Sequence, residues 1–170
     1  MKSNLKTMLQ VALLVAVEIV LSRFCSISTP FLKIGLAFLP LAVCGMLFGP
    51  VWGLIAGGLA DFLGAILFPI GPYFPGFTLS TALTGLVFGL CLYRRNTGWL
   101  HIALAVAVNN FVISLFVTTF WIHLLYGSSY LGLLLPRLGQ NLLLAPIEFV
   151  LIKLVQKPVT AYAALAQSRT

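Results

Sequence analysis

Charged side chains are scarce in this sequence, and acidic side chains are the scarcest of all. Only 8% of the 170 residues are charged, whereas 61% are hydrophobic. An ordinary soluble domain carries about 25% charged residues, and these help to form its polar surface. Ten Lys and Arg with three Asp and Glu cannot form such a surface. The composition therefore excludes a soluble globular protein and favours a single membrane domain over residues 1–170.

Cysteine and histidine are too few to suggest a disulfide framework or a metal centre. Cys25, Cys44 and Cys91 are odd in number and widely spaced, which predicts small core residues. His101 and His123 are isolated near the two expected edges of the membrane, with no carboxylate at metal-binding spacing. The sequence also lacks a phosphate-binding GxxxxGKS/T loop, a nucleophile elbow and paired catalytic carboxylates. Neither a cofactor nor a catalytic residue is expected.

Six continuous apolar runs predict an all-α bundle of six transmembrane helices. The first run follows Lys2 and Lys6 without an Ala-x-Ala cleavage signal, so we interpret it as a retained span. Gly49-Pro50 divides the second run from the third, because one unbroken helix of about 50 Å would exceed a bilayer core of about 30 Å. The runs lack the period-2 alternation of a membrane β-barrel. The predicted spans are residues 8–24, 35–49, 51–68, 77–93, 100–126 and 133–156.

The distribution of Lys and Arg predicts that both termini are cytoplasmic. Six spans place the termini on one side together with seven of the ten cations, and place Arg23, Lys33 and Arg137 on the other. The positive-inside rule assigns the cation-rich side to the cytoplasm. The net charge of +7 is therefore an orientation signal that also suits anionic lipid. No basic groove interleaved with aromatic residues is present, which argues against nucleic-acid binding.

Small residues four positions apart predict close packing of the helices. This spacing lets helix backbones approach each other in a membrane. Ala12 and Ala16 form such a pair on the first span, which begins the chain and can lie at the edge of the bundle. We interpret every pair as a contact within the bundle. The other pairs are Gly45 and Gly49, Gly53 and Gly57, Ala60 and Gly64, and Gly85 and Gly89.

The few polar side chains within the spans predict a polar layer in the outer half of the membrane. Ionisable groups are costly there, so they mark either a functional site or a structural pair. Helix rise places Glu18, Asp61 and Asn141 each about 10 Å below the outer surface. Arg137 lies one helical turn from Asn141 on the same face, and Arg23 also lies above the acids.

Two interpretations of this polar layer are open. In the first, Arg23 and Arg137 form internal ion pairs with Glu18 and Asp61. In the second, the layer lines an outward-facing pocket for an anionic solute, because cations, with Lys33 among them, outnumber acids near the outer surface.

The outer loop at residues 68–77 favours the pocket. Its Pro and Gly residues make it stiff, and its aromatic rings, with Trp121 nearby, could stack on a flat heterocycle. Anchoring at the membrane interface explains such rings equally well. Nearer the cytoplasm, Asn109, Asn110 and Glu148 lie at similar depths and are predicted to satisfy one another.

Four segments together resemble the folate-specific S components of energy-coupling factor (ECF) transporters. The segments are Val17–Phe24, Thr29–Gly35, Phe48–Pro50 and Gly71–Ser80, and the likeness extends motif by motif to Arg95. The resemblance implies a six-helix, vitamin-binding subunit of the plasma membrane, found mainly in Gram-positive bacteria. It implies a transmembrane coupling subunit and two cytoplasmic ATPases as partners, and a subunit that topples in the membrane to release its vitamin.

The resemblance also implies roles for particular residues. The small-residue motif of the family falls on Ala12 and Ala16, which become the predicted contact with the coupling subunit. Folate joins a flat, donor-rich pterin to an aminobenzoyl-glutamate with two carboxylates. A buried carboxylate accepts two parallel hydrogen bonds from a pterin, and Asp61 is the first candidate for this role, with Glu18 the second. The residues predicted for the site are Glu18, Arg23, Lys33, Asp61, Tyr73, Phe74, Pro75, Phe77, Trp121, Arg137 and Asn141.

The predicted cations and rings complete this scheme. Arg23 orients the acid or binds a ligand oxygen, Lys33 and Arg137 face the glutamate, and Tyr73, Phe74 and Trp121 stack on the rings. The alternatives are another planar vitamin, such as riboflavin or thiamine, and a small membrane enzyme or scaffold subunit. Thiamine is a cation, which the outer excess of Lys and Arg disfavours. An enzyme would need clustered His or paired acids, whereas the acids are spread over three spans.

Overall fold

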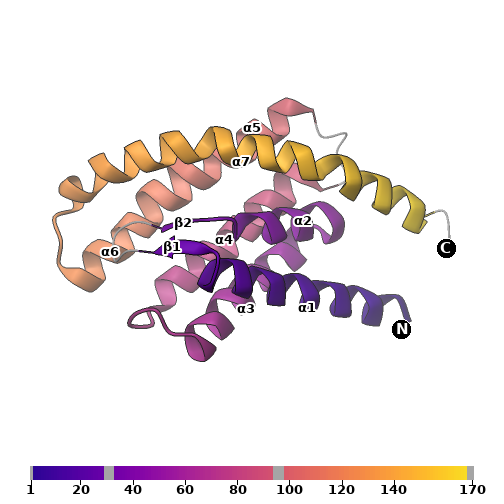
Figure 1. Cartoon of the computed structure of the whole chain (residues 1–170), viewed down its shortest axis with the longest axis horizontal. Coiled ribbons are helices and arrows are strands. Elements are labelled where there is room, and N and C mark those ends of the chain that lie inside the picture. Colours follow the sequence, from indigo (N-terminus) through magenta and orange to yellow (C-terminus); the bar gives the residue numbers. More distant parts are fainter. Residues whose placement is uncertain (1, 29–32, 94–97, 168–170) are drawn as a thin grey trace.

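The computed structural model is a helical bundle with one short pair of strands (Figure 1). It describes residues 2–28, 33–93 and 98–167. The antiparallel strands β1 (Ser26–Ser28) and β2 (Lys33–Gly35) follow the first helix. The helices are α1 (Lys2–Arg23), α2 (Phe38–Phe48), α3 (Pro50–Leu67), α4 (Pro75–Leu92), the continuous α5 (Trp99–Ala107), η1 (Val108–Thr118) and α6 (Thr119–Tyr126), and α7 (Tyr130–Gln167).

Each of the six predicted spans corresponds to a helical segment, so the predicted all-α membrane fold is confirmed. Five segments are long and apolar enough to cross a membrane, namely Leu5–Arg23, Pro50–Leu67, Pro75–Leu92, Trp99–Tyr126 and Tyr130–Ala161. The segment α2 has 11 residues and is about 16 Å long at 1.5 Å per residue. The sequence did not indicate the strand pair. Because residues 33–35 are extended in β2, α2 begins at Phe38, later than the predicted span.

Proline and glycine set the helix boundaries that were predicted from them. Pro50 and Pro75 occupy the first turns of α3 and α4, where the missing N–H group costs nothing. Gly49, between α2 and α3, has a φ of 91°, a conformation that other residues rarely adopt. The predicted break at Gly49-Pro50 is therefore confirmed.

Glycines bring the backbones of neighbouring helices into direct contact. Gly53 on α3 and Gly85 on α4 face each other so closely that a Cβ on either would overlap the opposite backbone. A Cβ at Gly45 on α2 would lie 2.7 Å from the backbone nitrogen of Gly89 on α4. These contacts confirm that two of the predicted pairs pack within the bundle, Gly53 with Gly57 and Gly85 with Gly89. In α1, by contrast, Ala12 and Ala16 are both exposed.

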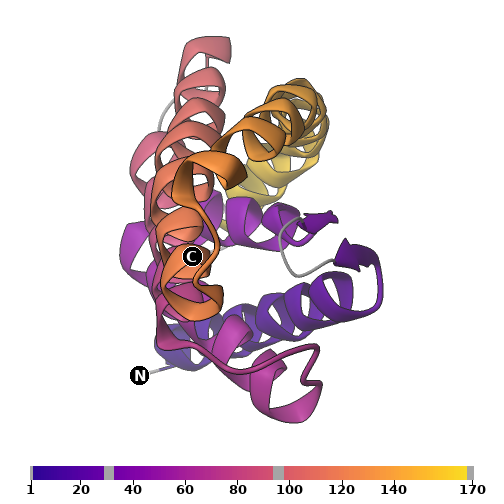
Figure 2. The same ribbon diagram turned by 90° about the vertical axis from the view of Figure 1, so that its left-hand side faces the viewer.

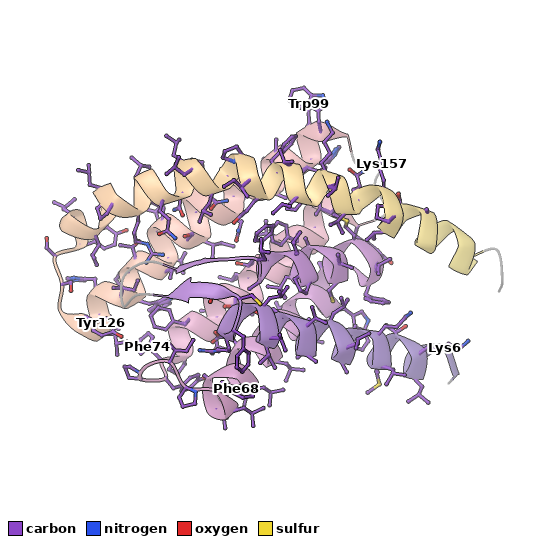
Figure 3. The ribbon with its side chains drawn as sticks, viewed as in Figure 1. Lys6, Phe68, Phe74, Trp99, Tyr126 and Lys157 are labelled. Atoms are coloured by element: carbon purple, nitrogen blue, oxygen red, sulfur yellow. The ribbon has the colours of Figure 1, made fainter. Side chains whose placement is uncertain are left out.

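The two ends of the bundle differ in chemistry. Figure 3 places Phe68, Phe74 and Tyr126 toward one end, and Lys6 and Lys157 toward the other. The start of α1 and the end of α7 both lie at the lysine-bearing end (Figure 1). This agrees with an even number of crossings and identifies the aromatic end as the outer one by the positive-inside rule.

Candidate binding site

A cavity of about 390 Å³ lies at the aromatic end of the bundle. Its walls come from the end of α1, α3, α4, the η1–α6 segment, α7 and the loop at residues 70–74. Figure 2 views the molecule from this end, with the α6–α7 connection and the strand pair in front. The volume is within the range of about 300–1,000 Å³ that is typical of small-molecule sites.

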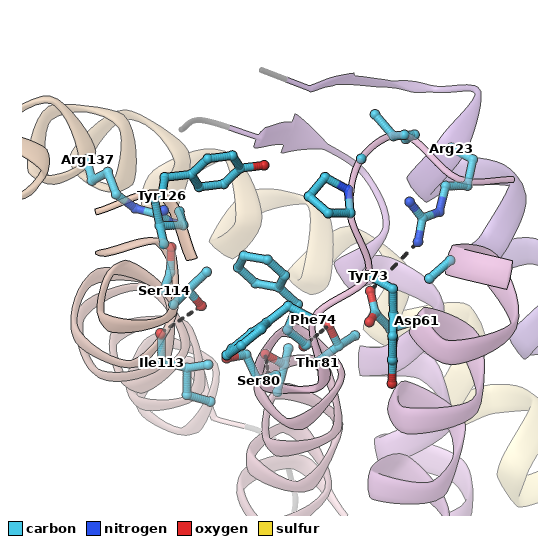
Figure 4. Close-up of a pocket in the computed structure, with 18 of the residues that line it drawn as sticks. Arg23, Asp61, Tyr73, Phe74, Ser80, Thr81, Ile113, Ser114, Tyr126 and Arg137 are labelled. Carbon is cyan, nitrogen blue, oxygen red and sulfur yellow. Dashed lines mark hydrogen bonds and ion pairs between the residues drawn. The ribbon is translucent and has the colours of Figure 1, made fainter. Parts of the chain in front are cut away.

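Asp61 anchors a polar cluster on one wall of this cavity (Figure 4). Its Oδ1 lies 3.9 Å from Arg23 Nη2, and its Oδ2 accepts a 2.8 Å hydrogen bond from Thr78 Oγ1. Thr78 Oγ1 also lies 3.3 Å from the Tyr73 hydroxyl. A bidentate Arg–carboxylate pair has shorter bonds of about 2.8 Å. The carboxylate therefore keeps accepting capacity for a solute.

Gly64 positions the guanidinium group of Arg23. A Cβ at Gly64 would lie 2.9 Å from Arg23 Nε and 3.2 Å from Arg23 Nη2. The pair Ala60 and Gly64 was predicted to pack against a helix backbone, whereas Gly64 receives a side chain from α1. Because Gly64 and Asp61 are three residues apart on one face of α3, the glycine brings Arg23 to the carboxylate.

Arg137 faces Asp61 from the opposite side of the cavity (Figure 4). It is buried on α7, near Ser114 of η1, which also lines the cavity. Ser114 Oγ donates a 3.1 Å hydrogen bond to Asn141 Oδ1, and Asn141 Nδ2 donates a 2.9 Å bond to the backbone oxygen of Asn110. Asn141 thus fastens α7 to η1 behind the cavity wall.

Hydroxyl and amide groups form the inner wall of the cavity. Thr84 Oγ1 lies 2.9 Å from Asn109 Oδ1 and 3.0 Å from the backbone oxygen of Ser80. The Ser80 hydroxyl is buried and has no hydrogen-bond partner among the described residues. Buried polar groups are almost always satisfied, so a bound solute is a natural partner for this hydroxyl.

Aromatic rings complete the cavity at its outer edge. Phe74, Phe77 and Tyr73 line it. The ring of Trp121 lies 5.7 Å from the ring of Phe74, and a Cβ at Gly76 would lie 2.5 Å from the Trp121 ring. Trp121 is not part of the lining, and it supports Phe74 from behind.

The π-helix η1 turns a whole row of side chains toward the cavity. Hydrogen bonds in a π-helix join residues five apart, so residues four and five apart share a face. Asn109, Ile113, Ser114 and Thr118 have this spacing, and all four line the cavity. In an α-helix, nine residues make about two and a half turns, so Asn109 and Thr118 would point in opposite directions. The local geometry of η1 is therefore part of the site.

The structure brings six of the eleven predicted site residues to the cavity. These are Arg23, Asp61, Tyr73, Phe74, Phe77 and Arg137. Glu18, Pro75, Trp121 and Asn141 are not part of its lining, and Glu18 is buried in α1. The side chain of Lys33 is outside the described residues, although its backbone pairs with Ser28. No group of three His, Cys, Asp or Glu in the described chain could hold a metal ion.

Reasoning from the sequence missed the uncharged polar lining. Ser80, Thr84 and Ser114 all face the cavity, and the spacing of four between Ser80 and Thr84 is the signal that could have placed them on one helix face. Asn109 was predicted only to pair with its polar neighbours. That pairing is confirmed, and Asn109 lines the cavity as well.

Comparison with known families decides the class of protein. The profile of the family described as ECF transporter, substrate-specific component, matches residues 6–156. The chain belongs to this family. Its members are substrate-specific components of transporters and not enzymes, and the resemblance found in the sequence is confirmed.

Named relatives agree with this family assignment. The chain is 36% identical over 149 residues to the folate transporter FolT of Clostridium novyi (strain NT), with 88% of this chain and 87% of that protein covered. A FolT of Leuconostoc mesenteroides is 26% identical over 153 residues, covering 86% and 82%.

Two crystal structures share its fold. A structure of FolT bound with folic acid has a TM-score of 0.85 at 35% identity, covering 88% of this chain and 92% of the other. The S component for biotin from an ECF-type ABC transporter has a TM-score of 0.67 at 19% identity, covering 92% and 93%.

Proposed function

We propose that this S component binds folate at the outer face of a bacterial plasma membrane for delivery into the cell. The observation that carries the proposal is the cavity with a carboxylate on one wall, a guanidinium on the opposite wall and aromatic rings at its edge. FolT relatives and the folic acid-bound FolT structure support folate over riboflavin, thiamine and other vitamins.

The chemistry of folate matches the order of groups in the cavity. Asp61 accepts two hydrogen bonds from adjacent N–H groups of the pterin, and Arg23 holds that carboxylate in place. Arg137 attracts the glutamate carboxylates from the opposite wall, with Lys33 as a second cation. Asp61 takes the pterin role ahead of Glu18, because only Asp61 lines the cavity.

Uptake requires partners, and the proposal includes a transmembrane coupling subunit and two cytoplasmic ATPases. Ala12 and Ala16 are one turn apart and exposed on α1. Small residues on a lipid-facing helix let a second helix approach closely, which makes this face of α1 the proposed contact with the coupling subunit.

Purified protein titrated with folic acid is expected to show saturable, one-to-one binding, measured by calorimetry or by quenching of tryptophan fluorescence. Riboflavin and thiamine, added in large excess, should leave folic acid bound, because neither combines a pterin with two carboxylates. Displacement of folic acid by riboflavin would instead assign the cavity to another planar vitamin.

Enlarging the small-residue face of α1 is expected to stop uptake without weakening folate binding. Ala16→Leu should lower copurification with the coupling subunit, and folate uptake by cells, by about tenfold or more, because overpacking a helix contact costs about 1–3 kcal/mol. Folic acid titration of the purified variant should match wild type, since Ala16 is not part of the cavity lining.

Ala107→Leu provides the matched control, because Ala107 is an exposed alanine on the different helix α5. Equal loss of uptake in both variants would remove the assignment of this α1 face to the coupling subunit.

A further inference from the structure

The buried carboxylate of Glu148 lies outside the cavity and is linked to its lining by a hydrogen bond. Glu148 lies on α7, is buried, and does not line the cavity. Its Oε2 accepts a 2.8 Å hydrogen bond from Asn110 Nδ2 and a longer, 3.4 Å bond from Asn109 Nδ2. Both asparagines are buried neighbours on η1, but only Asn109 is part of the cavity lining. The glutamate therefore has one contact with the site and one contact outside it.

The contacts of Asn109 fix the direction of its side-chain amide. A carboxylate only accepts hydrogen bonds, so the NH₂ group of Asn109 must face Glu148. The other end of the amide, Oδ1, accepts from Thr84 Oγ1 at 2.9 Å. Because the two ends of the amide have different partners, a rotated amide would place NH₂ against the Thr84 hydroxyl and oxygen against oxygen at Glu148.

This direction determines what the inner wall offers to a ligand. The Thr84 hydroxyl has one proton, which is shared between Asn109 Oδ1 and the Ser80 backbone oxygen. Its lone pairs remain for a ligand, and a carbonyl oxygen such as Oδ1 has a second lone pair. The wall therefore presents two neighbouring acceptors, which suit N–H groups of a ligand.

We propose that Glu148 is a positioning residue for ligand recognition, acting through Asn109. It holds the Asn109 carbonyl toward Thr84 and the cavity, so that the inner wall accepts hydrogen bonds from the ligand. The inference rests on the proposed function, because folate has several N–H groups and is the ligand proposed to donate them to this wall.

A double-mutant cycle with folic acid as the probe tests this role. Glu148→Met removes the acceptor at similar volume and is expected to weaken binding about tenfold, and Asn109→Ala should weaken it by a similar factor. If Glu148 acts through Asn109, the double variant binds folic acid as Asn109→Ala alone does. Multiplying effects in the double variant would overturn the proposal. Glu148→Ala enters the same cycle if Glu148→Met does not fold.

Two further variants separate positioning from general support of the fold. Glu148→Gln keeps an oxygen that can accept from both asparagines, so its affinity should stay within about threefold of wild type. Asn110→Ala removes the shorter bond to Glu148 at a residue outside the lining, so it should lower thermal stability but leave folic acid affinity unchanged.

A loss of affinity in Asn110→Ala as large as in Glu148→Met would show a merely structural role and overturn the proposal. Failure of the wild-type protein to bind folic acid would instead contradict the proposed function, and the two results are distinct.

Discussion

Asp61→Asn is expected to weaken folic acid binding by about a hundredfold, which corresponds to about 3 kcal/mol. The carboxylate offers two oxygens to adjacent N–H groups, whereas asparagine offers one oxygen and turns an NH₂ donor toward a ligand donor. The substitution also removes the negative charge beside Arg23. Calorimetric titration of the purified variant measures the effect.

The control and the alternative outcome distinguish two roles of this carboxylate. Thr160→Ala removes an exposed hydroxyl near the C-terminal end of α7, outside the cavity lining. This control variant should bind folic acid as the wild type does. If Asp61 serves only to neutralise Arg23, its removal leaves a cation in the cavity, and an anionic ligand would bind equally well or more tightly. That outcome would end the assignment of the pterin to Asp61.

Gly85→Ala is expected to lower the free energy of unfolding by at least about 3 kcal/mol, or to prevent folding. A Cβ at Gly85 would overlap the Gly53 carbonyl on α3. Two helix backbones would have to separate, because no flexible side chain is there to move aside. Unfolding of the detergent-solubilised protein, monitored by tryptophan fluorescence, measures the change.

Gly139→Ala is the matched control for this prediction. Gly139 lies inside α7 with nothing within 4 Å of its Cβ position. Alanine is a better helix former than glycine by about 1 kcal/mol, so this variant should be as stable as wild type or slightly more stable. Equal stability of Gly85→Ala and Gly139→Ala would contradict the close contact of α3 with α4.

Much of the fold could be predicted because the amino-acid composition changes where the helices end. Apolar runs end at Gly49-Pro50 and at the loop before Pro75, and the helices end there too. The strand pair and η1 could not be predicted. A π-helix is set by backbone hydrogen bonds between residues five apart, and an apolar run such as 108–118 carries no sign of that register.

The sequence predicted how deep the site residues lie in the membrane, but not toward which side each helix turns them. Counting residues along each span placed Arg23, Asp61 and Arg137 in one layer, and all three line the cavity. Depth does not determine which way a helix turns a side chain, and so Glu18 and Asn141, at the same predicted depth, lie outside the lining. Whether the lining residues bind folate stays a prediction that the titrations decide.

The interpretation of the polar layer as ion pairs and its interpretation as a pocket turn out to be compatible. Arg23 and Asp61 form an ion pair, and the same two side chains line the cavity. From the sequence, an ion pair and a pocket were alternatives. The sequence could not show that paired side chains on α1 and α3 also face a cavity. The side chains of Arg23 and Asp61 are 11% and 16% exposed, so neither is fully enclosed by the protein.

The long helix α7, which arches over the bundle in Figure 1, contains Pro136, Pro146 and Pro158. Each proline removes one N–H group from the hydrogen-bond ladder and loosens the turn before it. Bending stiffness is therefore lowest at three places along this helix. Only Pro146 lies between Arg137 and Ile152, and Ile152 is fully buried in the core. Any bend between the cavity-facing part of α7 and the part that Ile152 anchors is therefore expected at Pro146.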